Sequence, residues 1–351
     1  MNTVSLPERA APRDPLSDVL RSVHMRGAIF YWVSCRGDWV ATTPPSPDLA
    51  HALCPGAEHV IAYHWFARGS GWVAVDGAPP QRLSGGDVVI FPRGDAHVLS
   101  SAPGLRSREE DGTWRVTTRA DAKPILVALH DGVCEPSAEI PVEDADAVFV
   151  CGFISCDRKP FNPLIDALPA IMHMGAQRVG PWVGPMLEQA VAESRRRRPG
   201  SEAVLERVSE MVFVDAARRY LESLPEGEGT GWFAALRDRF VGRAIALMHD
   251  RPADPWTVDE LGRHVGLSRS ALHERFVAFV GQPPMQYLAN WRMQLGSNLL
   301  RDGNDTVAAI AQQVGYETEA AFSRAFKRAT GQPPAAWRRA YRAAAPLKAA
   351  A

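Results

Sequence analysis

The chain has 351 residues, of which 46% are hydrophobic and 23% are charged; this composition is typical of folded domains, and the length suffices for two or three of them. It contains no apolar run of roughly 18 residues, which excludes a transmembrane helix, and its polar, proline-containing N-terminus lacks a secretion signal, so we expect a cytoplasmic protein without membrane contact. Five scattered cysteines argue against a disulfide framework, and the 16 Lys/Arg against 10 Asp/Glu from Gly231 onward favour a polyanionic partner for that part.

The N-terminal part, from residue 26 to about 155, is predicted to form short β-strands. Its apolar runs are rich in Val, Ile and aromatic residues, and Gly, Pro and Asp separate them. Several such strands at this spacing predict a sandwich or barrel. The runs are His59–Phe66, Trp72–Val75, Val88–Phe91, Ile125–Leu129 and Val148–Phe153.

Two segments of this part resemble the conserved motifs of cupin barrels. The segment from Gly86 to His97 has the spacing of the second cupin motif, in which the histidine points into the barrel. The segment around His64 resembles the first motif. However, Ala62 and Gly69 stand where metal-binding cupins usually carry ligands. This departure argues against the metal chemistry of a cupin enzyme.

The remaining candidate ligands are two histidines and one cysteine. His64, His97 and Cys151, which lies on a later predicted strand, would suit zinc or another transition metal such as copper. The alternative is a pocket lined by neutral histidines, with Cys151 as a small apolar filler. The sequence leaves both the metal site and the neutral pocket open.

A redox switch would need a cysteine whose thiol has a lowered pKa. The further candidates for such a thiol are Cys35, Cys54 and Cys156.

After Pro163 the pattern becomes helical. Helices are predicted over Leu164–Met174, Trp182–Arg198 and Glu202–Leu224, where apolar residues recur at helical spacing. These helices could serve as a spacer, but we favour a dimer interface. The glycine-rich segment that ends at Gly231 is a predicted linker.

The last hundred residues contain an internal repeat. Each copy has a glycine, an apolar residue, a helix-capping residue, a helix containing Arg and Phe, and then Gly-Gln-Pro-Pro. The first copy runs from Gly266 to Pro284 and the second from Gly315 to Pro334. The glycine and the cap predict a tight turn between two helices. Such a duplicated unit predicts two helix-turn-helix elements that bind DNA, although a plain helical bundle would share part of the pattern.

Helix ends are marked in the same way throughout this repeat. Thr257 and Glu260 form a capping-box pattern, and Ser268 and Thr318 are predicted to cap the helices after each tight turn. A helix from about Met285 to Arg301 connects the two copies and would span about 25 Å. It would hold two recognition helices about one DNA turn apart.

Residues 240–342 resemble the DNA-binding domain of the AraC/XylS family of transcription regulators. The motifs that carry the resemblance are Trp256-Thr-Val258, Gly266-Leu-Ser-Arg-Ser270, Gly281-Gln-Pro-Pro-Met-Gln-Tyr-Leu288, Trp291-Arg-Met293, Val314-Gly-Tyr316, Phe322-Ser-Arg-Ala-Phe-Lys327 and Gly331-Gln-Pro-Pro334. The resemblance implies base contacts by Ser270, His273, Glu274, Glu319, Ala320 and Arg324. The side chains predicted to contact phosphates are Arg269, Lys327, Arg328, Arg338 and Arg339. A solvated helix charge is an equal alternative for Glu274. With its N-terminal motifs, the chain resembles the subgroup that carries a cupin-type sensor.

The sequence therefore predicts an α+β multidomain protein. We expect a cupin-like β-barrel sensor at 15–160, a helical linker or dimerisation region at 161–230, and an all-α double helix-turn-helix domain at 231–343. The predicted function is sequence-specific regulation of transcription, without enzymatic activity. The expected partners are double-stranded promoter DNA, RNA polymerase, a second copy of the chain, and an effector that is a small molecule, a metal or an oxidant. The alternative is a cupin-type metal-dependent enzyme with a helical appendage.

Overall fold

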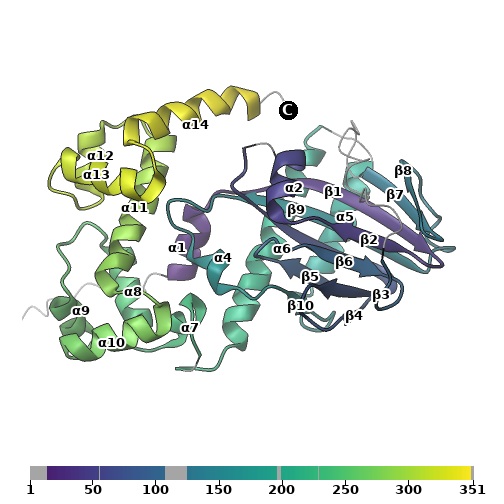
Figure 1. The fold of residues 1–351 in the computed structure, drawn as a ribbon, viewed down its shortest axis with the longest axis horizontal. Coiled ribbons are helices and arrows are strands. Elements are labelled where there is room, and N and C mark those ends of the chain that lie inside the picture. Colours follow the sequence, from purple (N-terminus) through teal and green to yellow (C-terminus); the bar gives the residue numbers. More distant parts are fainter. Residues whose placement is uncertain (1–13, 55, 107–124, 196–198, 228, 349–351) are drawn as a thin grey trace, which may run out of the picture. The chain divides into compact units, whose positions relative to one another are not determined.

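The computed structural model describes residues 14–54, 56–106, 125–195, 199–227 and 229–348 (Figure 1). The chain forms two compact units. The first comprises residues 23–158 and 165–223 and contains the strands found in the described ranges. The second comprises the described residues up to Ser22, residues 159–164, and the chain from Leu224 onward. None of the helices in these described ranges is long and apolar enough to span a bilayer.

The first unit is a curled sheet. Its path runs β10-β5-β3-β9-β1-β7-β8, while β2, β4 and β6 branch from it. β9 is central, since it pairs antiparallel with both β1 and β3. This curled half-barrel confirms the predicted cupin-like fold. The strands are β1 (Met25–Arg36), β2 (Val40–Thr43), β3 (His59–Val75), β4 (Gln81–Ser84), β5 (Val88–Phe91), β6 (His97–Ser100), β7 (Ile125–His130), β8 (Val133–Pro136), β9 (Ala147–Cys156) and β10 (Met172–Met174).

Two of the predicted strands belong to one long strand. The runs His59–Phe66 and Trp72–Val75 both lie in β3. A register shift between Phe66 and Arg68 bends this strand against β9. Because of the bend, its first part pairs with β5 and β9, whereas its second part pairs with β4 and β6. β3 thus closes one corner of the curled sheet.

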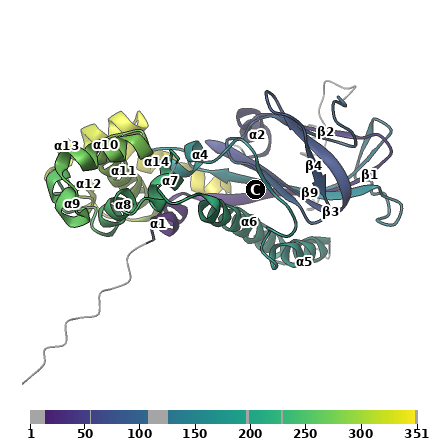
Figure 2. The ribbon, with the colours of Figure 1, turned by 90° about the horizontal axis from the view of Figure 1, so that it is seen from below.

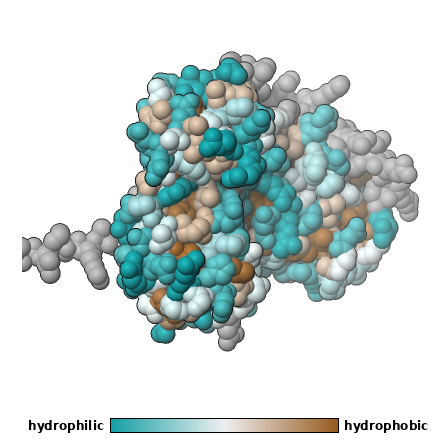
Figure 3. Space-filling model, turned by 60° about the vertical axis from the view of Figure 1, so that its left-hand side comes forward, coloured by the Kyte–Doolittle hydropathy of each residue, from teal (hydrophilic) through white to brown (hydrophobic). Residues whose placement is uncertain are grey.

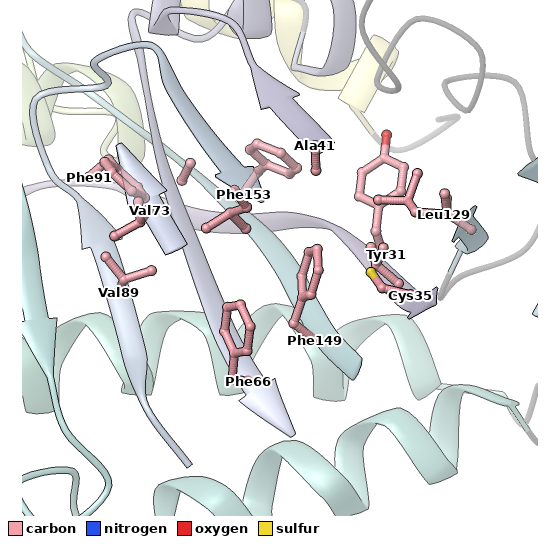
Figure 4. Packing of buried hydrophobic residues seen from close by; sticks show 14 of the residues in the cluster. Tyr31, Cys35, Ala41, Phe66, Val73, Val89, Phe91, Leu129, Phe149 and Phe153 are labelled. Carbon is pink, nitrogen blue, oxygen red and sulfur yellow. The ribbon is translucent and has the colours of Figure 1, made fainter. Parts of the chain in front are cut away.

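Apolar and aromatic side chains fill the concave side of the sheet (Figure 4). Phe66 stacks on Phe149, with 5.1 Å between ring centroids, and Trp39 lies 5.5 Å from the same ring. All three side chains are almost fully buried. The candidate metal-ligating side chains, His64, His97 and Cys151, therefore lie in an apolar interior that excludes water.

Two helices, α5 (Val183–Arg195) and α6 (Ser201–Ser223), follow the sheet in this unit. They match two of the predicted helices, although residues 196–198 of the predicted Trp182–Arg198 lie outside the described ranges. α6 packs against β1 and β9 (Figure 2). The Tyr63 hydroxyl reaches the Ser209 hydroxyl on α6 at 3.0 Å. Gly27 permits this close packing, since a Cβ there would lie 2.7 Å from Ser209.

The prediction of one helix over Leu164–Met174 is wrong. The structure has a short helix α4 (Pro163–Ala167) and then the strand β10, which pairs antiparallel with β5. Pro169 cannot continue a helix, and the edge of β5 offers backbone partners to the residues that follow. Another short helix that the periodicity did not reveal, α2 (Ser46–Leu53), precedes β3.

The second unit is helical. Its helices are α1 (Pro15–Ser22), α7 (Trp232–Arg237), α8 (Val241–Asp250), α9 (Val258–Val265), α10 (Arg269–Val280), α11 (Pro284–Asp302), α12 (Val307–Gln313), α13 (Glu319–Thr330) and α14 (Pro334–Lys348). The predicted connecting helix corresponds to α11, which extends one residue further at each end. Two pairs, α9–α10 and α12–α13, form the two predicted helix-turn-helix elements.

The predicted caps of these helices are confirmed. The Thr257 and Glu260 side chains form a complete capping box at α9, and Gly266 ends that helix in the left-handed conformation. The hydroxyls of Ser268 and Thr318 accept hydrogen bonds from backbone amides in the first turns of α10 and α13. Each helix-turn-helix element is thus fixed by local chemistry within a few residues.

Two segments distant in sequence complete the helical unit. The Gln294 amide on α11 donates to the Ser22 carbonyl at the end of α1, at 2.9 Å. Its oxygen accepts from the Phe161 amide at 3.1 Å. Gln294 is almost fully buried, so these two bonds satisfy a polar group that would otherwise be costly in the core. Residues 15–22 and 159–160, predicted as part of the barrel domain, and residues 161–164, predicted as the start of the linker region, therefore group with the helical unit.

Candidate nucleic-acid interface and barrel histidine cluster

The first recognition helix, α10, has clearly separated faces. Leu272, Phe276 and Phe279 are buried, because they recur at helical spacing on the core side. The predicted DNA-contacting residues of this helix are exposed; they are Arg269, Ser270, His273 and Glu274. Arg269 makes one contact that the sequence did not suggest, an ion pair with Asp259 at 3.8 Å.

The second recognition helix, α13, has the same organisation. Phe322 and Phe326 are fully buried and pack in one core with Trp337. The predicted contact residues are again exposed; they are Glu319, Ala320, Arg324 and Lys327. Within the described part of the chain, Arg324 and Lys327 have no acidic partner at ion-pair distance, so both cations are available to a ligand.

α11 lies between the two elements, with α9 and α10 near one end and α12 and α13 near the other (Figure 1). Its 19 residues give it a length of about 28 Å. Hydrophilic residues predominate on the face of this unit that Figure 3 shows. A helical unit that presents two exposed, capped helices on one connecting rod has the layout of a DNA-binding domain for two successive grooves.

One arginine interpreted as a phosphate contact has a structural role instead. Arg338 is half-buried and donates to the carbonyl oxygens of Leu300, at 3.2 Å, and Asp305, at 2.6 Å. It joins α14 to the end of α11. Arg328 on α13 and Arg339 on α14 are exposed, and the prediction that they contact phosphates stands.

A buried carboxylate that sequence reasoning missed supports α10. Asp238 accepts hydrogen bonds from the backbone amides of Phe240 and Val241 at the start of α8, and from the Arg275 guanidinium of α10, with Nε at 3.0 Å. Burial alone would raise the pKa of Asp238, but these hydrogen bonds and the Arg275 charge outweigh it and lower the pKa. An Asp just before a helical segment is a capping signal that could have identified it.

The three candidate ligands of the barrel do come together. His64 Nδ1 lies 2.9 Å from the Cys151 sulfur, and His64 Nε2 lies 2.7 Å from His97 Nε2. β3 and β9 place His64 opposite Cys151 in register. The His97 ring stacks on Phe91, with 3.5 Å between centroids, and its Nδ1 faces the Asp95 carbonyl at 2.9 Å.

This arrangement does not fit the predicted three-ligand metal site. His64 turns opposite ring nitrogens toward Cys151 and His97, so the three donor atoms cannot converge on one ion. No group of three or more His, Cys, Asp or Glu side chains in the described ranges is placed to hold a metal. The cluster is instead a row of hydrogen-bonding groups inside an apolar cup.

The buried Cys35 and Cys156 and the half-buried Cys151 are poor candidates for an oxidant sensor. Burial raises the pKa of Cys35, Cys151 and Cys156 well above that of an exposed thiol. Because the thiolate is the reactive form, these thiols are held in their inert state. The remaining predicted redox residue, Cys54, is half-buried.

Acid is expected to destabilise the sheet unit through His64 and His97, two of its buried histidines. Burial lowers the pKa of His97 to about 4, and burial together with His97 lowers that of His64. The unfolded chain therefore binds more protons between about pH 6.5 and 4. Stability is fully present above pH 6.5 and falls with acidification, by roughly 1 kcal/mol per pH unit for each histidine. Urea unfolding between pH 7 and 4.5, followed by hydrogen exchange of β3 and β6, would measure this slope.

Replacing both histidines with glutamine removes the titrating groups and keeps hydrogen-bonding capacity. The double variant should show a shallower pH dependence in these strands. The matched control is His51→Gln, since His51 lies on α2 and is exposed. An unchanged slope in the double variant would show that other groups cause the acid sensitivity.

Comparisons with known proteins agree with this geometry. Residues 14–222 match the cupin family, and residues 261–340 match the helix-turn-helix domain family. The chain is 31% identical over 328 residues to a Streptomyces lividans protein described as an AraC-like transcription regulator, covering 93% of this chain and 98% of that protein. It is 26% identical over 329 residues to the HTH-type transcriptional regulator AlkR of Acinetobacter baylyi, covering 93% and 99%. It is also 26% identical over 297 residues to the regulator MtrA of Neisseria gonorrhoeae, covering 82% and 87%.

Proposed function

Because this chain belongs to the AraC family of DNA-binding transcription regulators and carries a cupin domain at its N-terminus, we propose that α10 and α13 recognise promoter DNA under the control of that domain. The alternative of a cupin enzyme is set aside, since the relatives that match along most of the chain are transcription regulators. The observation that carries the proposal is the exposure of all eight predicted contact residues on two capped helices.

The contacts divide into two classes. Ser270, His273 and Glu274 on α10, and Glu319, Ala320 and Arg324 on α13, face base edges in the major groove, where side chains can distinguish base pairs. Arg269 and Lys327 bind phosphates and add affinity without sequence preference. Selection of duplexes from a random library with the full-length protein tests this proposal. The recovered duplexes should share two half-sites about one helical turn apart, with affinity that falls as salt rises.

For the sensor, we propose an effector that is a small organic molecule. The support is the pair of neutral, buried imidazoles of His64 and His97 next to apolar walls. A bound effector would take over the hydrogen bond that the two rings now make to each other. A metal is disfavoured because the nitrogen and sulfur atoms of His64, His97 and Cys151 do not converge on one point. An oxidant is disfavoured because the pKa of the Cys151 thiol is raised, which keeps the thiol in its unreactive protonated form.

Three parallel measurements separate the effector classes. A thermal-shift screen with small organic acids, alcohols and aromatics should find compounds that stabilise the wild type, and His97→Gln should reduce that shift. Metal analysis of purified protein should find no stoichiometric metal. Hydrogen peroxide should leave the Cys151 thiol unmodified by mass spectrometry. Stoichiometric zinc or copper would contradict the organic effector and indicate a metal. Rapid oxidation of Cys151 with release of DNA would contradict it and indicate an oxidant.

The exposed face of α6 supports a homodimer. Val204 and Met211 are 45% and 47% exposed and lie seven residues, or two turns, apart. The half-buried Val214 continues the same stripe. Such spacing lets two copies of the helix pair along an apolar seam. Met211→Glu should therefore shift the protein toward monomer in sedimentation velocity.

The matched control for this dimer is Val133→Glu, which introduces the same charge at a 49% exposed valine on β8. It should leave the sedimentation coefficient unchanged. A wild type that is monomeric at micromolar concentration would contradict the dimer.

A regulator that acts on promoters also needs access to the chromosome and to RNA polymerase, so we place the protein in the cytoplasm with the polymerase as a further partner.

A further inference from the structure

Arg292 stands in the middle of α11, at the junction of the two helix-turn-helix elements. Its Nε donates to the Pro252 carbonyl at 2.7 Å, and its Nη2 donates to the Asp254 carbonyl at 2.8 Å. Both carbonyls belong to the loop between α8 and α9, which leads into the first helix-turn-helix element. One planar guanidinium therefore holds two points of that loop.

The same side chain contacts the second element. The guanidinium carbon lies 5.9 Å from the centre of the Tyr316 ring, in the turn between α12 and α13. The Tyr316 amide donates to the Ala311 carbonyl at 2.8 Å. Its ring packs edge-on against Phe322, with 5.7 Å between centroids, and Phe322 anchors the first turn of α13. The orientation of α13 is thus linked to Arg292 through Tyr316.

The two elements also touch directly, backbone to backbone. Gly315 has φ +84°, and a Cβ there would lie 2.7 Å from the Ala253 Cα and 2.9 Å from an Arg292 nitrogen. Only glycine combines this conformation with so close an approach. The loop of the first element and the turn of the second therefore pack together with no side chain between them.

The partners of Arg292 are unusual for a half-buried cation. Within the described ranges no carboxylate lies at ion-pair distance from its guanidinium, and its hydrogen bonds go to neutral carbonyls. Desolvating a charge without a counter-ion costs free energy. A lysine ammonium could also donate to both carbonyls, but its three donors rotate freely, whereas the fixed planar fork of arginine sets the geometry of both hydrogen bonds.

We propose that Arg292 and Gly315 fix the distance and angle between α10 and α13, and thereby set the one half-site spacing that the protein accepts. Arg292 is a positioning residue, since it acts on DNA through the two helices. The inference rests on the proposed recognition by α10 and α13. The free-energy gain of binding two half-sites at once depends on geometry, because a rigid connection matches one spacing and a loose one tolerates several.

The test uses the full-length protein and three duplexes derived from one that the wild type selects from a random library. The first is the selected duplex, the second has one base pair inserted between the half-sites, and the third keeps a single half-site. The variants are Arg292→Ala, Arg292→Lys and Gly315→Ala. The control is Arg301→Ala, on the same helix, whose guanidinium contacts Asn298 and Asp302 of α11 itself and lies 5.7 Å from the centre of the Tyr341 ring on α14.

Arg292→Ala should bind the selected duplex about tenfold more weakly, bind the single half-site like the wild type, and lose most of the penalty for the inserted base pair. Arg292→Lys should restore part of that penalty. Gly315→Ala, which forces the backbones apart, should prefer the longer duplex. Arg301→Ala should keep the wild-type penalty.

Two results would overturn the inference. One is an Arg292→Ala protein that keeps the full insertion penalty, and the other is an equal loss on the single half-site and the selected duplex, which indicates a general folding defect. Failure of the proposed function looks different, since wild-type selection would then recover no paired half-sites and Arg324→Ala would leave affinity unchanged.

Discussion

Arg324→Ala is expected to lower the affinity for the selected operator by roughly ten- to a hundred-fold, which corresponds to about 1–3 kcal/mol. Arg324 is exposed on α13, and the described residues hold no acid at ion-pair distance from it. An arginine so placed can donate two hydrogen bonds to guanine O6 and N7. Its loss should therefore relax the base preference at one position of the second half-site. Fluorescence anisotropy with the selected duplex and its single-base variants measures this.

The comparison with a phosphate contact makes the prediction specific. Lys327→Ala removes a charge from the same helix, three residues further on. It should weaken binding to all duplexes alike and reduce the salt slope by about one, without a change in base preference. Adding Ser270→Ala and His273→Ala to Arg324→Ala should abolish discrimination between operator and random DNA. If operator binding is indifferent to these three positions, α10 and α13 are not the recognition helices.

The helical unit could be predicted in detail because its signals are local. A capping residue, a left-handed glycine and an apolar stripe each act within one or two turns of a helix. Ser268, Gly266 and Phe276 therefore define α10 without knowledge of the rest of the fold, and the structure places each as expected. The exposed positions follow from the buried ones by the helical period.

The contacts that orient the elements could not be predicted, because they join residues distant in sequence. Arg275 meets Asp238 across 37 positions and Arg292 meets Pro252 across 40, and no periodicity marks such pairs. The barrel cluster shows the same limit. Motif spacing brought His64 and His97 together, but the rotation of the His64 ring, which decides against the metal site, is set by packing.

The error at residues 164–174 has a related cause. Apolar residues in that segment fit a helical stripe, yet the open edge of β5 makes a strand more favourable. A short apolar run takes its conformation from the surface that it meets. Local patterns are therefore sufficient for elements that satisfy their own backbone groups, and insufficient for a strand that needs a partner.

Asp238→Ala is expected to destabilise the helical unit by about 3 kcal/mol. Its carboxylate is 1% exposed, and the substitution removes the cap of α8 together with the anchor of α10. Because Arg275 remains 40% exposed and can be hydrated, we expect the lower end of the range for a broken buried pair. Hydrogen exchange of the full-length protein in urea, monitored on α7, α8 and α10, would localise the loss. Asp250→Ala, an exposed carboxylate on α8, is the matched control.

The pH dependence separates the charge of Asp238 from its size. Its folded pKa lies below the unfolded value, so its contribution is fully present above about pH 4 and is lost as the pH falls through the folded pKa. The difference in stability between wild type and Asp238→Asn should therefore be largest near neutrality and should shrink toward acid. Asp238→Asn should also bind the operator more weakly than the wild type, since α10 loses the ion pair that anchors it. A pH-independent difference would mean that the carboxylate stabilises the unit through packing alone, and an unaltered operator affinity would mean that Arg275 does not position α10.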